Sequence, residues 1–394
     1  IPMCALNEVK GMKLKMKNII IFFLNLFFKI FKVEDNHIVF FSSRNRVDGN
    51  PREIYLYLKK NCNSKFNMKY MVYKGTEIDK LDSKDICYHR TLKSLYYISK
   101  AKYWIMSDSV NPVLKKKKSQ IYIQTFHGHG PVKKMGLEID EYRKEHTENK
   151  LKHIQDWDIY ISMCEEEETQ IKNSTGFDQK IFRLGIPSTD PIARSKKLSS
   201  DEIENLKKKY NIPLDKKIVL YAPTYREDLL GKENIKLNIE SLCELQDYVF
   251  LVRLHPLLNS KTDKNIFKNS NFINCENVPD IVDLYPITDI LISDYSASIY
   301  EFALTDKKII LYPYDYEKYS TYPGIVIDYQ KIMPGPICYT EKELYNTLKN
   351  LDTSFNGYEK KLKKFNKKFN YLNDGQATKR FVENLNCGNF DIKE

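Results

Sequence analysis

Two histidines follow an apolar, strand-like run in the stretch IQTFHGHGPVKKMG, which begins at Ile123. His127 and His129 are separated by one glycine. Alternate residues of a strand point to one face, so the pair could bind a metal ion. Imidazole also titrates near neutral pH, which suits a general base. A third interpretation makes both histidines turn residues, because glycines flank His129.

A zinc site at these histidines would lack its remaining ligands. The chain contains no H-E-x-x-H motif, and its 8 cysteines include no C-x-x-C pair, whereas a zinc ion takes four ligands, at least three of them from the protein. The glycines on both sides of His129 also indicate that the strand has already ended. We therefore predict that His127 is a base presented at a strand end and that no metal is bound.

Three more apolar runs end in polar side chains. The runs are KIVLYAP, YVFLVRLHP and DILISDYSAS, and the polar residues are Thr224, Arg226, Arg253, His255, Asp294, Ser296 and Ser298. In open α/β sheets, ligands bind in the crevice at the carboxyl ends of the strands. Four such strand ends therefore predict one binding cleft.

Phosphate is the ligand that these groups suit best. SDYSASIYEFA predicts a strand, a turn of hydroxyl residues and a helix that begins about Ser298, where free backbone N–H groups attract anions. Ordinary N-capping by a serine is the alternative. Arg253 and His255 would share one strand face and repel each other unless an anion such as a diphosphate lay between them. The alternative for His255 is a buried histidine bonded to the backbone.

The chain has no G-x-x-x-x-G-K-[ST] or G-x-G-x-x-G motif, so neither a P-loop ATPase nor a dinucleotide-dependent oxidoreductase is supported.

The elements that would carry these groups alternate between short β-rich runs and helical stretches, which predicts an α/β fold with parallel sheets. One series of strands runs from His37 to Cys164 and a second from Lys217 to Asp315. The polar segment between them, at about 195–215, is the expected boundary. The chain of 394 residues fits two domains. We expect two Rossmann-like domains facing a cleft, over residues 33–200 and 201–394, with helices closing the C-terminal one.

Residues 1–32 differ from the rest of the chain. The apolar run Ile19–Phe31 is flanked by lysines, and as a helix of thirteen residues it would rise about 20 Å, short of the hydrocarbon core of about 30 Å. We predict an amphipathic helix lying in the interface of an anionic membrane, with a buried core helix as the alternative. Residues 1–11, which do not begin with methionine, are interpreted as an extraneous remnant.

The formal net charge of +11, from 63 Lys+Arg against 52 Asp+Glu, favours anionic partners. A lysine-rich composition with solvated faces would produce the same charge. A membrane- or nucleic-acid-binding protein without enzymatic activity would explain the charge, but not the polar groups at four strand ends. We therefore expect an enzyme with no nucleic-acid partner.

Seven stretches resemble, in order and spacing, the CDP-glycerol glycerophosphotransferase family, the teichoic acid primases and polymerases. They span roughly Asn36 to Asn384 and are QTFHGHGPVKKMG, LGIPSTDP, LYAPTYRED, LVRLHP, ISDYSASIYEFA, ILYPYDYEKY and IDYQKIMPGP. The resemblance implies a glycosyltransferase-B-like (GT-B-like) fold, peripheral on the cytoplasmic face of the membrane. It also implies transfer of glycerol phosphate or ribitol phosphate from a CDP-alditol to a lipid-linked acceptor, with release of CMP and without a cofactor.

The resemblance also implies roles for individual residues. His127 matches the histidine taken as the base, and His255 matches one that contacts the donor phosphates. The donor is expected near six other residues: Thr224, Arg226, Arg253, Asp294, Ser296 and Ser298. Lys133 and Lys134 suit an anionic acceptor or the membrane surface, with a solvated helix start as the alternative.

The chain departs from the family pattern at two places. HGHGP replaces HGTP, so His129 is an additional residue with an auxiliary role toward the acceptor, and Ala297 replaces the second serine of SDYSS. A long extra N-terminal region is missing, which favours a primase or short-chain transferase. A ribitolphosphotransferase and a GT-B glycosyltransferase that uses a nucleotide sugar remain alternatives, and an oligomer is compatible with these features.

Overall fold

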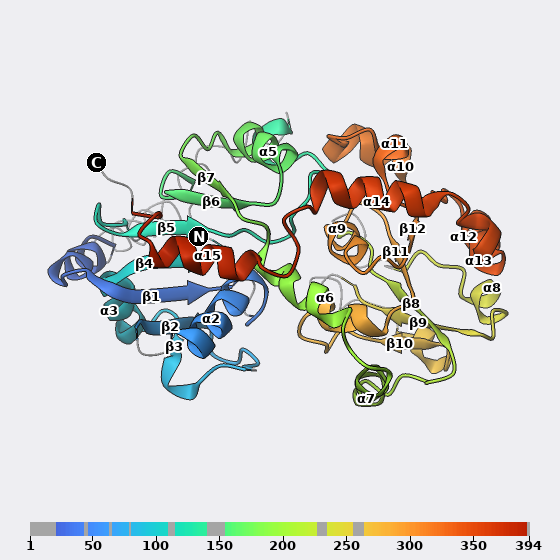
Figure 1. Ribbon diagram of the computed structural model, residues 1–394, viewed down its shortest axis with the longest axis horizontal. Coiled ribbons are helices and arrows are strands. Elements are labelled where there is room, and N and C mark those ends of the chain that lie inside the picture. The colour runs from blue at the N-terminus through green and yellow to red at the C-terminus, as the bar shows by residue number, and fades with distance from the viewer. Residues whose placement is uncertain are drawn as a thin grey trace, which may run out of the picture.

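The computed structural model describes residues 21–391 except 43–45, 63–64, 79, 109–114, 140–153, 227–234 and 255–263. Two parallel β-sheets form the centres of two domains, which lie side by side in Figure 1. Helices cover both faces of each sheet. The predicted two-domain α/β architecture is therefore confirmed.

The N-terminal sheet has seven strands in the order β3-β2-β1-β4-β5-β6-β7. Their bounds are β1 Glu34–Phe41, β2 Asn67–Val72, β3 Ile86–Tyr88, β4 Ala101–Met106, β5 Ile121–Gln124, β6 Ile159–Ser162 and β7 Lys180–Arg183. The sequence predicts five of these strands. It misses the edge strands β3 and β7, which are only partly buried and so lack a continuous apolar run, whereas the equally short β5 and β6 are buried throughout.

The two faces of this sheet are covered by different helices. Ile38 and Phe40 of β1 pack in one core with α2 and α15, whereas Val39 and Phe41 pack on the opposite face with α3. The helices of this half are α2 Gly49–Asn61, α3 Leu92–Lys100, α5 Glu165–Thr175 and α6 Asp190–Ser195. Short 3-10 helices are η1 Ser83–Asp85, η2 Gly136–Glu138 and η3 Pro187–Thr189.

The C-terminal sheet has five strands in the order β10-β9-β8-β11-β12. Their bounds are β8 Lys217–Tyr221, β9 Tyr248–Val252, β10 Phe272–Asn274, β11 Ile290–Ser293 and β12 Lys308–Leu311. Four of the five are predicted by their apolar runs. Ile218 and Leu220 of β8 pack with helices α9 and α14, and Val219 and Tyr221 pack with α12 on the other face.

Many short helices surround this second sheet. They are α7 Ser200–Lys209, α8 Ile239–Cys243, α9 Ser298–Ala303, α10 Tyr316–Tyr319, α11 Tyr329–Ile332, α12 Glu341–Lys349, α13 Leu351–Ser354 and α14 Tyr358–Phe369. The last helix of the chain, α15 Ala377–Asn386, follows them. The segments η6 Lys264–Lys268 and η7 Ile281–Ile287 are 3-10 helices, and η8 Ser320–Gly324 is a π-helix. The run of amphipathic helices expected after Thr340 is present.

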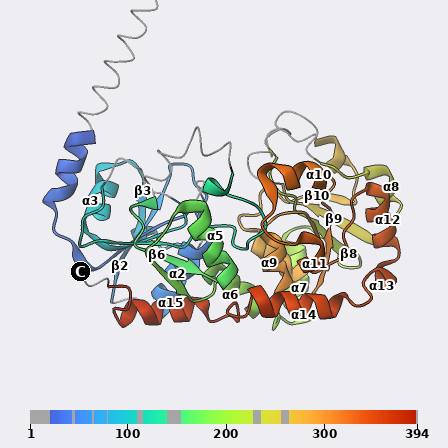
Figure 2. The same cartoon turned by 90° about the horizontal axis from the view of Figure 1, so that it is seen from above.

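The C-terminal helices do not all belong to the second domain, which corrects the expected domain 201–394. Figure 2 shows α14 along the C-terminal domain and α15 along the N-terminal one. Phe381 and Leu385 of α15 lie in the same core as Ile54 of α2. The apolar stripe of α15 was visible in the sequence, but which sheet it would cover depends on the path of the chain after α14.

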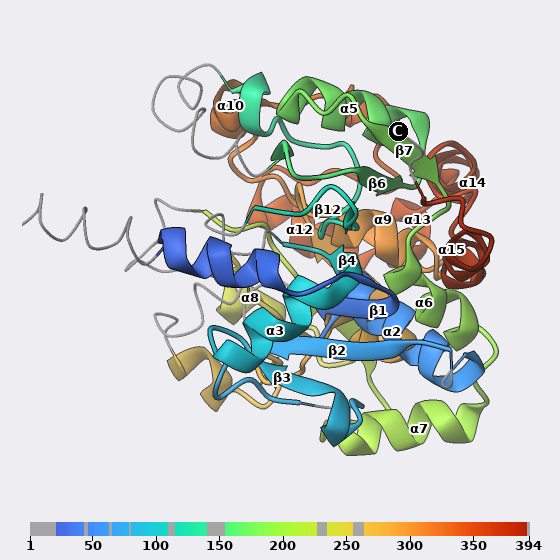
Figure 3. The ribbon, with the colours of Figure 1, turned by 90° about the vertical axis from the view of Figure 1, so that its left-hand side faces the viewer.

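Residues 21–30 form a helix on the side of the molecule opposite α14 and α15 (Figures 2 and 3). Phe28 is fully buried, 6.0 Å from the ring of Trp104. The remainder of the predicted membrane helix, before residue 21, lies outside the described residues. In the part of the chain that is described, no helix has both the length and the apolar character needed to cross a bilayer.

Replacing Phe381 tests whether α15 belongs to the N-terminal core. Its side chain is 0% exposed, so Phe381→Ala should lower the free energy of unfolding by about 3–5 kcal/mol, measured by urea denaturation. Lys379→Ala, an exposed change on the same helix, is the control and should change the free energy by less than about 0.5 kcal/mol. Equal effects of the two variants would contradict the assignment of α15.

Candidate active site

A cleft of about 530 Å³ lies between the two domains. Residues that follow β5, β8, β9 and β11 line it, as the strand-end argument predicts. Five of the predicted site residues are among them: His127, Lys133, Thr224, Arg253 and Ser296. His255 lies outside the described residues. The other predicted residues do not line this cleft; they are His129, Lys134, Arg226, Asp294 and Ser298.

His127 is an exposed side chain just beyond the end of β5. Its Nδ1 lies 2.9 Å from the carbonyl oxygen of Ser107, and its ring stacks on Phe126 with centroids 5.2 Å apart. A carbonyl oxygen only accepts, so Nδ1 carries the proton and donates to it. The neutral ring therefore has its basic lone pair on Nε2, the arrangement that a general base requires.

The turn after β5 carries His127 across to the C-terminal domain. Phe126, Gly128 and Gly130 all have positive φ angles, of 53°, 74° and 108°. A Cβ atom on Gly130 would lie 2.4 Å from the ring of Tyr300 on α9, so only glycine fits there. The Tyr300 hydroxyl donates to the carbonyl of Pro131 over 3.1 Å. The turn is thereby held against the second domain.

His129 is buried, unlike His127, with 6% of its surface exposed. Its Nδ1 lies 2.5 Å from Oε1 of Glu167, and its Nε2 lies 2.9 Å from the carbonyl of Thr125. Burial opposes the charged ring, but the carboxylate of Glu167 and the two hydrogen bonds outweigh it and raise the pKa of His129. His129 thus supports the turn from within. It does not line the cleft but lies in the wall of a smaller adjoining cavity, so its expected role toward the acceptor stays a prediction.

The zinc interpretation finds no support in this geometry. The described residues contain no cluster of three or more His, Cys, Asp or Glu side chains arranged to hold a metal ion. Instead, His127 is hydrogen-bonded to the carbonyl oxygen of Ser107, and His129 is hydrogen-bonded to a carboxylate oxygen of Glu167.

Arg226 and Asp294 pair with each other below the cleft, which corrects their predicted contact with the donor. Nη2 of Arg226 lies 2.9 Å from Asp294, and its Nε lies 2.8 Å from Asp315. The guanidinium also lies over the ring of Tyr319, 4.7 Å from its centroid. Asp294 accepts in addition from the N–H and hydroxyl of Thr224. The two charges neutralise each other and hold the loop after β8 in place.

Arg253 and Arg46 form the positively charged part of the cleft. Within the described residues neither guanidinium lies within 4 Å of a carboxylate, and Nη1 of Arg253 donates to the carbonyl of Glu276. Burial and the nearby charge of Arg46 lower the pKa of Arg253 to about 10. Two like charges facing one cleft indicate a site for an anion, as expected from the pair Arg253 and His255.

The serines after β11 form local hydrogen bonds, but neither is the N-cap of α9, which is Ala297 and makes no side-chain cap hydrogen bond. Oγ of Ser296 accepts from the N–H of Ser298 over 3.3 Å. Ser298 is buried, and its own hydroxyl lies 3.4 Å from Ser293. Ser296 and Ala297 line the cleft, whereas Ser298 does not, so its predicted contact with the donor is corrected.

Lys133 and Lys134 lie in an extended segment that pairs with the C-terminal domain. Lys133 forms a bridge with Ile325, and the N–H of Lys134 donates to the carbonyl of Gly324. The solvated helix start is therefore wrong. Lys133 lines the cleft, and Lys134 is exposed outside it with its stem against Gly324.

The acidic residues around His127 and the basic residue Arg46 were not predicted from the sequence. Asp48 and Asp280 line the cleft with Arg46, and Glu301 lies beneath it. Arg46 and Asp48 follow the end of β1, so the strand-end argument could have found them. Glu301 could not be found in this way, because it lies within the apolar helix α9.

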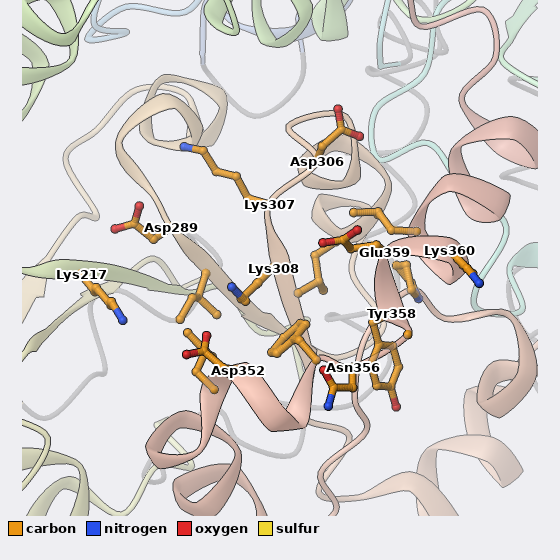
Figure 4. Close-up of a pocket in the computed structure, with 17 residues that line it drawn as sticks. Lys217, Asp289, Asp306, Lys307, Lys308, Asp352, Asn356, Tyr358, Glu359 and Lys360 are labelled. Carbon is orange, nitrogen blue, oxygen red and sulfur yellow. The ribbon is translucent and has the colours of Figure 1, made fainter.

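Another cavity, of about 850 Å³, lies at the opposite edge of the C-terminal sheet (Figure 4). Lys217 and Lys308, the first residues of β8 and β12, line it. Its charges are mixed, and the amine of Lys307 already donates to three backbone carbonyls. None of its described lining residues directly follows the carboxyl end of a strand, where the groups suited to chemistry lie.

Comparison with known proteins identifies relatives over almost the whole chain. Residues 21–386 match a family described as CDP-glycerol:poly(glycerophosphate) glycerophosphotransferase. The chain is 30% identical over 373 residues to the teichoic acid glycerol-phosphate transferase of Staphylococcus aureus, covering 90% of this chain and 94% of that protein. It is 32% identical over 308 residues to the teichoic acid glycerol-phosphate primase of Bacillus subtilis, covering 75% and 76%.

A solved structure shows the same fold. A variant of the wall teichoic acid polymerase TagF superposes with a TM-score of 0.85 at 25% identity, covering 98% of this chain and 97% of that one.

The ion pair of His129 and Glu167 predicts a pH-dependent stability. Because folding raises the pKa of His129, its contribution is complete below the ordinary pKa of about 6.5 and disappears as pH rises through the higher folded-state value. His129→Gln should therefore lower the free energy of unfolding by about 3 kcal/mol at pH 5.5 and by clearly less at pH 9, measured by urea denaturation.

The control for this experiment is His37→Gln. Burial lowers the pKa of His37, so the contribution of this residue should instead decrease as pH falls. If the loss for His129→Gln were the same at both pH values, the ion pair would not be the source of the stability.

Proposed function

Because this chain belongs to the CDP-glycerol:poly(glycerophosphate) glycerophosphotransferase family, we propose that it transfers glycerol phosphate from CDP-glycerol to a hydroxyl group of a lipid-linked acceptor. CMP is the other product, and the polymer is a teichoic acid or a related cell-surface polymer. The observation that carries the proposal is the cleft itself. A histidine with its basic nitrogen on Nε2 shares this cleft with two arginines that no carboxylate pairs among the described residues.

The geometry supports a direct displacement at phosphorus. Nε2 of His127 takes the proton of the acceptor hydroxyl, whose oxygen attacks the β-phosphorus of the donor. The bond from that phosphorus to the bridging oxygen breaks, and CMP leaves with the electron pair. Arg46 and Arg253 stabilise the charge on the diphosphate, and Thr224 lies beside them. Catalysis of phosphoryl transfer depends mainly on such positioning and electrostatics.

Turnover with different donors separates the proposed reaction from its alternatives. CMP release from CDP-glycerol in the presence of acceptor supports it, whereas preference for CDP-ribitol or for a UDP-sugar would favour a ribitolphosphotransferase or a glycosyltransferase. The length of the products distinguishes addition of one unit from polymerisation.

Removal of the proposed base should abolish transfer and preserve binding. We expect His127→Ala to lower kcat for CMP release by about 10²–10⁴-fold, with the Kd for CDP-glycerol, from calorimetry, changed by less than threefold. His89→Ala is a matched control, since this histidine packs on Phe41 and Tyr73, away from the cleft. Near-normal turnover by His127→Ala would refute the role of His127 as base.

We also propose that helix 21–30 rests on the cytoplasmic face of the membrane, where the nucleotide donor and the lipid-linked acceptor meet. Four large side chains on this short helix are exposed, at 51–71%: Phe22, Phe23, Leu26 and Ile30. Their spacing puts them on one side of the helix, opposite the buried Phe28. Lys29 and Lys32 in the same segment suit anionic lipid headgroups.

Loss of these side chains should weaken membrane binding. Burying one of them contributes about 1.5–3 kcal/mol, so replacing Phe22, Phe23 and Leu26 by serine should lower affinity for vesicles with 30% anionic lipid at least about tenfold, measured by sedimentation. Leu214→Ser is the control, because Leu214 is 47% exposed elsewhere on the surface. Unchanged sedimentation of the triple variant would show that another surface binds the membrane.

A further inference from the structure

A second, smaller cavity of about 190 Å³ adjoins the cleft at His127. The two share Arg46, Asp48, His127 and Asp280, so a molecule in the cavity reaches the base directly. Its deeper walls include Glu301 of α9 and residues of the N-terminal domain. The reaction proposed above does not use this space.

The balance of charged groups differs between the cavity and the cleft. Among the described lining residues, the cavity has three carboxyl groups, those of Asp48, Asp280 and Glu301, and one guanidinium, that of Arg46, with the buried His129 also in its wall. The cleft has only two of these carboxyl groups and has Lys133 and Arg253 in addition to Arg46. Asp280 also forms an ion pair with Arg52, at 3.0 Å. Such walls repel a phosphate group. They favour a ligand part that is uncharged and rich in hydroxyl groups, since each hydroxyl can donate a hydrogen bond to a carboxylate.

Two of the carboxyl groups also gain hydrogen-bond donors at neutral pH. Burial and the nearby Asp280 raise the pKa of Asp48 to about 7. Burial likewise raises the pKa of Glu301 to about 7, although the hydroxyl of Tyr285 donates to it over 2.7 Å. A carboxyl group that is partly protonated both donates and accepts, which matches the two roles of an alcohol.

The size of the cavity limits the ligand. At about 30 Å³ per water molecule, 190 Å³ holds about six waters, and a glycerol unit has about six non-hydrogen atoms. We propose that this cavity binds a glycerol-sized polyol unit of a substrate through Asp48, Asp280 and Glu301 and presents one of its hydroxyls at His127. The inference rests on the proposed function, which supplies two such units: the glycerol of the donor and the terminal unit of the acceptor.

Isosteric amides test the cavity with little change of shape. Glu301→Gln and Asp48→Asn are compared with Glu359→Gln, an exposed change at the remote cavity of Figure 4. For each variant, Kd is measured for CDP-glycerol and for CDP, and KM is measured for CDP-glycerol and for the lipid-linked acceptor. Thermal denaturation verifies folding.

Two results support the inference and identify the source of the polyol. A rise of at least tenfold in the Kd of CDP-glycerol with the Kd of CDP unchanged assigns the cavity to the donor glycerol. A rise of at least tenfold in the KM of the acceptor alone assigns it to the acceptor. Equal weakening of CDP and CDP-glycerol, or no change in any constant, overturns the inference.

A size variant keeps the test independent of the carboxyl groups. Val282 lines the cavity, and Val282→Ala enlarges it without removing a polar group. This variant should raise turnover of CDP-ribitol, or of an acceptor ending in ribitol phosphate, relative to the glycerol form by at least fivefold. An unchanged ratio counts against a polyol in the cavity.

If the wild-type protein releases no CMP from CDP-glycerol but binds it more tightly than CDP, the proposed function fails and the cavity assignment stands.

Discussion

The close approach of Gly130 to the ring of Tyr300 is the contact on which the arrangement of the site depends. No side chain fits between the turn after β5 and helix α9, so the backbone of one domain lies directly against the other. The hydroxyl of Tyr300 holds the same turn through Pro131. His127 is therefore positioned relative to the donor side of the cleft by packing, although it belongs to the opposite sheet.

The distribution of charge around this contact separates groups that support the site from groups that can bind a ligand. Arg226 is neutralised by Asp294 and Asp315 and further enclosed by tyrosine rings. Arg46 and Arg253 have no such carboxylate partner in the described part of the chain. Burying like charges together is unfavourable unless an anion joins them, so these two arginines are the pair that we propose binds the donor diphosphate.

The two histidines of the HGHG stretch illustrate how burial decides a role. One ring is exposed beside the cleft and has its basic nitrogen on Nε2; the other is enclosed and paired with Glu167. Both were candidates on residue type and spacing alone. The positive φ angles of Gly128 and Gly130 bend the chain between and after them, which sends the two rings into different surroundings.

The sequence by itself determined the two parallel sheets, nearly all of the long strands and the strand ends that form the cleft, because apolar period and turn residues are local properties. It also identified the family, through His127 and the motifs around it. Only the tertiary structure decided that Arg226 and Asp294 neutralise each other and that α15 returns to the first domain. It likewise brought Glu301, hidden in an apolar helix, beneath the base. Those outcomes depend on which groups meet across the two domains, and pairing over such distances leaves no periodic signal in a single chain.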